Sequence, residues 1–370
     1  MKRLPLRTLM VALAILLAAA LVLLTPPLMS RQPNPRLPHA ADRTLLRVWI
    51  TSSIGGGQAW LKEQLKVWEK RNPGVMTYLR TVSAEEVAAE EAVLPDIILY
   101  MPGDFSAPEE IFSPLSGELN ARESLLRAGK WRNQQYGLPL CYGAWVLAID
   151  SAIEPGSAAT PAPTTLLGRP AATDPAQATQ DPGFPLEAAS RADVALQAPA
   201  GCGLFSLSTL LPERPPLPEN FATLAPADVY SGFLARKYAS ALLTTGQLTA
   251  LTALTAAGKG FPFRVLTPGE IITDQVWFGS IVEGASSEAA SLLAFLTATE
   301  AQQSLTKQGL HTVRDDLRLY AVGTEAQIES AAARSVTAIN AYVPAADVQS
   351  AAWQVFSGRE DLSSGLLPLL

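Results

Sequence analysis

Side chains that could carry out acid–base or metal chemistry are few in this chain of 370 residues. Its two histidines, His39 and His311, cannot readily form a paired-histidine metal site or a histidine-based triad with a second proton carrier. We expect His311 to be a structural residue at a helix end. Adjacent carboxylates fall in predicted helices or loops, where a solvated face is the default. These pairs are Glu85 and Glu86, Glu109 and Glu110, and Asp315 and Asp316. We therefore expect no catalytic residues, no metal and no cofactor, and we predict that the protein is not an enzyme.

Motifs for phosphate or nucleophile chemistry are also missing. The chain has no G-x-S-x-G elbow, no P-loop and no H-E-x-x-H sequence. The glycine triplet from Gly55 to Gly57 lacks both the G-x-G-x-x-G spacing and the lysine of a phosphate cradle. The sequence thus argues against a nucleotide ligand.

Aromatic and small polar residues do gather at predicted strand ends. Tyr100 closes a buried strand just before Asp104, and Tyr142 joins two extended segments. Such rings can stack on the apolar faces of a sugar while Ser52, Ser53 and Asp104 supply hydrogen bonds, which is the mixed lining of a small-molecule pocket. Plain packing of the rings at the sheet edge is the alternative.

The stretch from Leu46 to Val82 positions the first of these groups. Apolar residues to Ile50 indicate a buried parallel strand, and the period then changes from two to about 3.6 after the glycines, which indicates an amphipathic helix ending at Asn72. A second strand follows from Val75. In open α/β sheets, ligands bind beyond the carboxyl ends of strands, where helix N-termini offer free N–H groups. The unit therefore predicts binding.

The rest of the chain alternates in the same way, except that residues 151–200 are rich in Ala, Pro, Thr and Asp and predict an irregular or flexible insertion. Ser287 is a candidate helix cap. The expected strands and extended crossing segments are Asp96–Met101, Tyr136–Asp150, Ala239–Thr244 leading into a turn at residues 245–247, Phe261–Leu266 and Asp274–Val282; the expected helices are Ser83–Ala92, one around residues 229–234, Ser287–Leu305, Glu325–Tyr342 and Ala345–Phe356.

The N-terminus has the pattern of an export signal. Three basic residues precede an apolar run from Leu9 to Leu24, no convincing cleavage site follows, and no cysteine is available for lipid modification there. The run is intermediate in length between a signal and a comfortable membrane span. We favour an uncleaved membrane anchor over residues 1–30 and a spacer over residues 31–44, with cleaved secretion as the alternative. Either route puts the body outside the cytoplasm, held at the cell membrane or secreted.

Charge and cysteine content restrict the partners. Beyond residue 40 the chain has 23 basic and 34 acidic side chains, a net charge of −11, which disfavours nucleic acid and anionic lipid as partners of the body. Cys141 and Cys202 are the two cysteines, so a disulfide framework is excluded. One bridge between them and two separate buried thiols are both open.

Taken in order, five segments resemble the extracellular solute-binding proteins of ABC importers, in the large family that includes the maltose-binding protein. They cover about half of the chain: VWITSSIGGGQAWLKEQLKVWEKRNPGV, PDIILYMPGDF, YGLPLCYGAWVLAID, FLARKYASALLTTGQL and EAASLLAFLTATEAQQSLTKQGLHTVRDDL. The resemblance implies an α/β, two-lobe periplasmic-binding-protein-like fold of type II, here with an N-terminal membrane helix. It also implies a small solute, such as a sugar, held by cleft closure and delivered to an ABC permease in the membrane.

The resemblance further implies lobe boundaries and ligand contacts. Lobe 1 would comprise residues 45–140 and 278–322, and lobe 2 residues 141–277 and 323–370. The implied ligand contacts are Ser52, Ser53, Gly55, Tyr100, Asp104, Tyr142, Thr245, Gln247, Trp277 and Tyr342. Two departures from the family, a disorderly start to lobe 2 and the anchor, leave an alternative: a membrane-tethered homologue that acts as a sensor or scaffold without transport.

Overall fold

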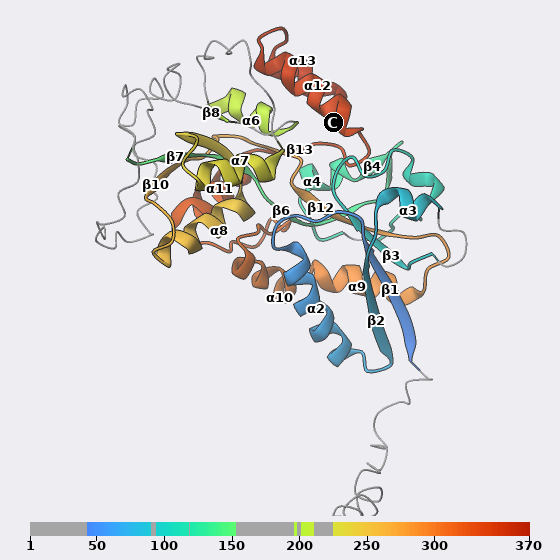
Figure 1. Cartoon of the computed structure of the whole chain (residues 1–370). Helices are drawn as coiled ribbons and strands as arrows, with labels where there is room; N and C mark the ends of the chain where they lie inside the picture. Colours follow the sequence, from blue (N-terminus) through green and yellow to red (C-terminus); the bar gives the residue numbers. More distant parts are fainter. Residues whose placement is uncertain (1–42, 90–93, 118, 153–195, 198–200, 211–224) are drawn as a thin grey trace, which may run out of the picture.

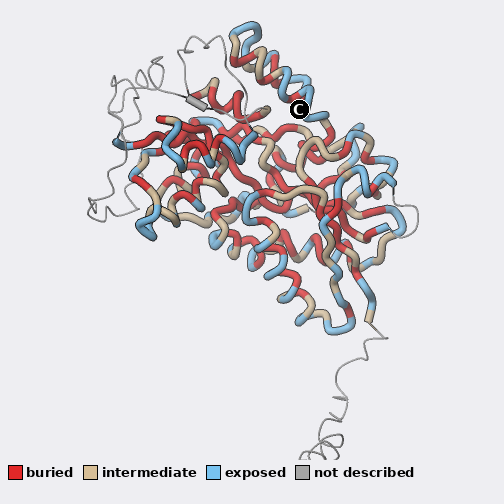
Figure 2. The backbone as a smooth tube through the Cα atoms, in the orientation of Figure 1, coloured by how far each residue is buried: buried red, intermediate tan, exposed pale blue. Residues whose placement is uncertain are grey.

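The computed structural model describes residues 43–370 apart from residues 90–93, 118, 153–195, 198–200 and 211–224 (Figure 1). Two sheets dominate these residues. The first has five strands in the order β2-β1-β3-β12-β6, and the second has four in the order β10-β7-β9-β8. In Figure 2 the strands are mostly buried, and exposed residues lie on the outer turns of the helices. The mixed α/β class predicted from the sequence is confirmed.

The first sheet forms from the predicted strand, helix and strand. β1 (Thr44–Ile50) pairs in parallel with β2 (Val75–Thr81) and β3 (Ile97–Tyr100). β12 (Val276–Ile281) joins β3 and β6 (Leu138–Tyr142) in antiparallel fashion. The carboxyl ends of β1 and β3 therefore open at one edge, as the period change after Ile50 predicted.

Helices cover both faces of this sheet because its strands are apolar on both sides. On one face, Leu46 and Val48 pack with Leu61 and Leu293 of the amphipathic helices. These are α2 (Gly57–Arg71), α9 (Ser287–Leu296) and α10 (Thr299–Gln303). On the other face lie α3 (Ala84–Ala89), α4 (Glu123–Ala128) and the hairpin of β4 (Lys130–Trp131) and β5 (Gln134–Gln135).

The second sheet is built around β7 (Trp145–Asp150), which pairs in antiparallel fashion with β9 (Ser240–Thr244) and β10 (Phe263–Leu266). Alternate β7 side chains enter two cores, with Leu147 on one face and Ala148 on the other. The first core receives α6 (Gly203–Leu210), α12 (Ala345–Phe356) and α13 (Leu362–Leu366), and the second receives α7 (Pro226–Leu234) and α8 (Thr245–Ala256).

Two extended crossings link the sheets, as expected. β6 leaves the first sheet at Tyr142, and β7 begins the second at Trp145. The return passes through β11 (Ile271–Thr273) to β12, with β13 (Val336–Ala338) paired to β11.

Four local predictions were wrong. The helix expected from Ser287 to Leu305 breaks after Leu296, where Thr297 is the C-cap of α9, and α10 begins at Thr299. The expected turn at residues 245–247 is the first turn of α8. The helix expected from Glu325 to Tyr342 ends early: α11 spans Gly323–Arg334, and β-branched Val336 and Thr337 then join strand β13. Ser286, not Ser287, is the N-cap residue of α9. In the predicted insertion, β8 (Leu196–Gln197) pairs with β9, and residues 153–195 lie outside the described part.

Both cysteines are free thiols, and both are buried, so the alternative of two separate thiols holds in this structure. Burial raises the pKa of each thiol. The predicted anchor, residues 1–30, lies outside the described residues. In the part of the chain that is described, none of the helices combines the length and the apolar character needed to span a bilayer.

Candidate functional site

A carboxylate joins the two loops that follow β1 and β3. Asp104 accepts a 2.7 Å hydrogen bond from the Thr51 hydroxyl and a second bond from the Ser52 hydroxyl. Ser52 Oγ in turn accepts a bond of 2.8 Å from the backbone N–H of Met101. Because strands β1 and β3 are parallel neighbours, their polar carboxyl ends meet. These bonds link the loops after β1 and β3, which together form what is called the rim of the first sheet below.

The loop after Thr51 reaches the second sheet at a pair of glycines. A Cβ atom placed on Gly246 would lie 3.2 Å from the carbonyl oxygen of Gly55, which is tighter than ordinary van der Waals contact. Gly246 stands in the first turn of α8, so this helix end directly abuts the loop after β1. The two polypeptide backbones can approach this closely because neither residue carries a side chain.

The N-terminus of α8 satisfies its own donors. Thr244 and Gln247 form a capping box: the Gln247 N–H donates to Thr244 Oγ1 (3.3 Å), and the Thr244 N–H donates to Gln247 Oε1 (3.0 Å). The Gln247 amide nitrogen also donates to the Pro226 carbonyl (2.9 Å). The Gln247 side chain is therefore engaged in holding α8.

Thr245 connects α8 to the first crossing. Its side chain is buried, its Oγ1 accepts from the Ala144 N–H (3.3 Å), and its own N–H donates to the Ala144 carbonyl (3.0 Å). A Cβ atom on Gly143 would lie 2.6 Å from Thr245 Oγ1, so the crossing passes this helix end in van der Waals contact.

The aromatic residues predicted to stack on ligand lie inside the protein. Tyr100, Tyr142, Trp277 and Tyr342 are each at most 1% exposed. Tyr100 Oη lies 2.8 Å from Ser280 Oγ and 2.9 Å from Tyr342 Oη. Burial raises the pKa of both phenols, which keeps them neutral donors. Packing accounts for all four rings in this conformation, and ligand contact by any of them stays a prediction.

Trp277 supports the rim from below. Its indole N–H donates to the Ser52 carbonyl (2.8 Å), and a Cβ atom on Gly57 would meet its ring at 3.1 Å. Trp277 on β12 therefore supports the loop after β1, a strand of the same sheet.

A second buried pair is formed by Tyr142, at the start of the first crossing, and His311, its bridge partner. Their backbones exchange hydrogen bonds (2.9 and 3.2 Å), and their ring centroids are 5.4 Å apart. The Tyr142 hydroxyl and both His311 ring nitrogens are buried without a hydrogen-bond partner among the described residues. Burial, and then the nearby Arg122 charge, lower the pKa of His311 to about 3, so the imidazole is neutral. His311 thus lies in a backbone bridge and not at the helix end that the sequence predicted.

The structure thus divides the ten predicted residues into two groups. The rim group comes together from both sheets and is at least partly exposed except for Thr245; it consists of Ser52, Ser53, Gly55, Asp104, Thr245 and Gln247. The buried group consists of Tyr100, Tyr142, Trp277 and Tyr342. Nothing in the sequence separated these groups, because the face to which a strand-end ring points depends on tertiary packing.

Amide side chains at the rim were missed by sequence reasoning. Gln58 donates to Ser53 Oγ (3.2 Å), and Gln275 donates to Asp274 Oδ1 (2.9 Å) beside the second crossing. Burial raises the pKa of Asp274, although hydrogen bonds from Gln275 and Trp145 oppose this shift. Gln308 lies against Gly56, whose φ of +83° requires glycine. The glutamine directly after the glycine triplet, Gln58, was the available signal.

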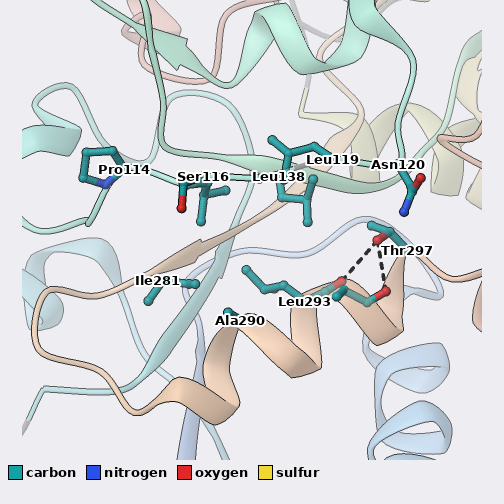
Figure 3. A pocket seen from close by; sticks show the side chains of 12 residues that line it. Pro114, Ser116, Leu119, Asn120, Leu138, Ile281, Ala290, Leu293 and Thr297 are labelled. Atoms are coloured by element: carbon teal, nitrogen blue, oxygen red, sulfur yellow. Dashed lines mark hydrogen bonds between the residues drawn. The ribbon is translucent and has the colours of Figure 1, made fainter.

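A separate cavity of 330 Å³ lies between α9, the edge of the first sheet and the loop before α4 (Figure 3). Leu138 and Ile281 come from the sheet, Leu293 and Thr297 from α9 and its end, and Leu119 from the loop opposite. None of the ten predicted residues lines it. Among the described residues, no group of three or more His, Cys, Asp or Glu side chains could hold a metal ion.

We compared the chain with known proteins. No protein-family model and no curated protein matches the chain, whereas several solved structures have a similar fold. The GacH receptor of Streptomyces glaucescens, solved free and with acarbose, superposes with a TM-score of 0.55 at 13% identity, over 88% of this chain and 96% of that one. The maltose-maltodextrin binding protein of Alicyclobacillus acidocaldarius gives 0.54 at 13% identity, over 88% and 98%.

An ABC substrate-binding protein from Listeria monocytogenes, in complex with cycloalternan, gives a TM-score of 0.53 at 12% identity, over 88% of this chain and 96% of that one. At such identities the likeness concerns the fold. The chain therefore has the type II fold of the maltose-binding-protein-like solute-binding proteins of ABC importers, as its five ordered segments predicted.

Proposed function

We propose that this protein is an extracytoplasmic solute-binding protein that captures a small carbohydrate by cleft closure and delivers it to an ABC permease. The observation that carries the proposal is the close contact between Gly55, in the loop after β1 of the first sheet, and Gly246, in the first turn of the helix that follows β9 of the second sheet. Type II folds of this kind support it, and the similar structures named above include complexes with acarbose and cycloalternan. Carbohydrate is therefore the first ligand class to test.

In this proposal the two crossings are the hinge. Lobe 1 comprises residues 45–140 and 278–322, and lobe 2 comprises residues 141–277 and 323–370. Hinge bending at the crossings moves the Gly55 loop away from the first turn of α8 and opens a cleft between them. Binding needs no covalent chemistry, because ligand buried between the lobes stabilises the closed state by its differential affinity.

Polar rim groups would supply the ligand contacts. Ser53 and Gln58 are half-buried and bond one another, and a sugar hydroxyl can replace either partner at little net cost. The Asp104 carboxylate is already bonded to Thr51 and Ser52, so it orients the loop first and has lone pairs left for a ligand.

A second candidate is a membrane-tethered homologue that acts as a sensor or scaffold for a partner protein without transport. Two observations favour it: the four aromatic rings at the site are buried against protein, and the backbone at Gly55 is already in contact with the first turn of α8. A protein whose lobes stay together presents a constant outer surface, which suits a scaffold.

A thermal-shift panel separates the two candidates. The full chain in detergent micelles is heated with maltotriose, maltotetraose, mannotriose and an oligopeptide. A true ligand at 100 times its Kd adds about 2.7 kcal/mol of stability by mass action and raises Tm. The Ser53→Ala variant should lose the shift, and Ser357→Ala, far from the rim on α12's end, should keep it. Lack of any shift, with a receptor co-purifying, would support the scaffold.

A further inference from the structure

Exposed apolar side chains gather on one face of the first sheet, at the amino ends of β1 and β2. Leu45 is 36% exposed, Met76 43%, Tyr78 52% and Leu94 45%. These four residues, called the exposed sheet face below, are most of the large apolar side chains that are exposed in the described part of the chain. Figure 2 shows the exposed ends of these strands at the lower edge of the molecule. Contiguous apolar exposure of this kind marks an interaction surface.

Strand register brings three of the four side chains together. Leu45 pairs with Met76, and Arg47 pairs with Tyr78. Leu46 and Val48 are buried under α2, and side chains alternate along a strand, so Leu45, Met76 and Tyr78 share the opposite face. Leu94 lies in the segment just before β3, whose first residue, Ile97, pairs with Val48.

This face is uncovered because its helix is short and lies elsewhere. α3 spans only Ala84–Ala89, and its Val87 packs with Trp49 and Val82 towards the carboxyl half of the strands. β2 is also an edge strand of the sheet. The amino half therefore has no covering element among the described residues.

The exposed sheet face has arginines next to it. Arg47 lies between Leu45 and Trp49 on β1, and the guanidinium of Arg80 on β2 lies 5.0 Å from the Trp49 ring centroid. The negative charge of the body as a whole does not decide its local character, since charges more than about 8 Å away are largely screened at physiological ionic strength. Arginine stems and a tyrosine beside aliphatic side chains suit the headgroup region of a bilayer.

The chain enters the body at the same end. β1 begins at Thr44, and the apolar run that ends at Leu24 precedes the described Arg43 by 19 residues. Such a tether reaches at most about 60 Å when fully extended. An anchored body is thus confined near the bilayer with this end of the sheet nearest to its point of attachment.

We propose that the exposed sheet face lies against the phospholipid surface of the membrane that holds the N-terminal run. The inference rests on the N-terminal membrane anchor that the sequence predicts, but not on carbohydrate binding. A second copy is a poorer occupant, because a symmetric contact would bring Arg47 and Arg80 of two copies together.

The test uses the full chain reconstituted in vesicles of phosphatidylcholine and phosphatidylglycerol. An environment-sensitive fluorophore is attached to Tyr78→Cys or, as a matched control, to Val322→Cys, which is 77% exposed on another part of the molecule. Both native cysteines are buried. Iodide quenching at position 78 should fall about threefold in vesicles relative to detergent, and quenching at position 322 should stay unchanged.

A second variant guards against misfolding artefacts. Met76→Asp in the Tyr78→Cys background should restore quenching while leaving the urea midpoint of unfolding unchanged, since Met76 is exposed. Equal quenching at both positions in floating vesicles overturns this surface but leaves the anchor standing. A chain that does not float with vesicles overturns both. Protection from iodide that is already present in detergent would mean that the chain's own N-terminal segment covers the face. Protection that rises with protein concentration would mean that a second copy covers it. Either result overturns the lipid proposal.

Discussion

Tyr142 and His311 lie opposite one another in a two-residue backbone bridge, with ring centroids 5.4 Å apart and three polar atoms left without a partner among the described residues. This pair lies where the first crossing leaves the first sheet. Charged groups of both signs act on Tyr142: Arg122, Glu329, Arg318 and Asp315. The crossing is therefore a place where protonation and stability are coupled.

Stability should fall as the pH drops below the ordinary histidine value. The pKa of His311 is about 3 in the folded protein and 6.5 in a free side chain, so between these values the unfolded chain binds a proton that the folded chain does not. The stabilisation is complete above pH 6.5 and is lost progressively towards pH 3, at up to about 1.36 kcal/mol per pH unit. Urea unfolding of the wild type and His311→Phe measures it.

The difference in unfolding free energy between wild type and His311→Phe should shrink by about 2 to 3 kcal/mol from pH 7 to pH 4.5. His39→Phe is the matched control, since His39 is the other histidine of the chain, and it should leave the pH profile unchanged. A parallel pair of profiles for wild type and His311→Phe would show that His311 ionises normally.

Gln247 is expected to stabilise a helix and to leave ligand binding alone. Its side chain closes the capping box with Thr244 and bonds Pro226. Gln247→Ala should lower the unfolding free energy by about 1 kcal/mol, while Gln247→Glu, which keeps an acceptor at the same place in the box, should lose less. Sugar affinity measured by calorimetry should be equal in all three proteins. A large loss of affinity with unchanged stability would restore Gln247 as a ligand contact.

Tyr100 and Tyr342 should behave as one hydrogen-bonded unit in the core. Each hydroxyl is bonded to the other at 2.9 Å, and Ser280 adds a further bond to Tyr100. Tyr100→Phe and Tyr342→Phe should each cost about 0.5 to 1.5 kcal/mol, and the double variant should cost less than their sum. Additive losses in urea unfolding would mean that the two hydroxyls do not share a bond in solution.

Periodicity predicted the elements well wherever local pattern and tertiary packing agree. The helix predicted from Ala345 to Phe356 has those ends in the structure, and the helix stop at Asn72 is one residue beyond Arg71. The pattern failed after Arg334, where Val336 to Ala338 pair with Ile271 to Thr273. A partner more than sixty residues away decides that strand, and no local signal reports it.

The site was predictable only in outline. The polar carboxyl ends of β1 and β3 follow from parallel strand order, so Ser52 and Asp104 could be brought together from sequence. The burial of Tyr100 and Tyr342 could not, because it depends on Phe105, Phe112 and Phe278 surrounding the Tyr100 ring. The role of Gly246 was hidden for the same reason, since its neighbour Gly55 lies in a loop almost two hundred residues earlier in the chain.

Closure between the two proposed lobes should depend on the missing side chain of Gly246. A Cβ atom there would be 3.2 Å from the Gly55 oxygen, which a small shift of the loop can relieve, whereas a larger side chain would hold the loop and α8 apart. Gly246→Ala should therefore have a small effect and Gly246→Leu a large one. Gly246→Leu should weaken sugar binding about tenfold or more, equivalent to about 1.4 kcal/mol, and should increase the radius of gyration in X-ray scattering.

Gly74→Leu is the matched control for this wedge, because a side chain at Gly74 would meet nothing within 4 Å. It should leave both affinity and scattering unchanged. Equal affinity in Gly246→Leu and Gly74→Leu, with an increased radius only in the former, would separate lobe closure from ligand binding and favour the scaffold. An unchanged radius of gyration in Gly246→Leu would mean that α8 shifts locally to accommodate the larger side chain. The proposed hinge at Tyr142 to Trp145 would then not open, because a flexible hinge would let the two lobes move apart.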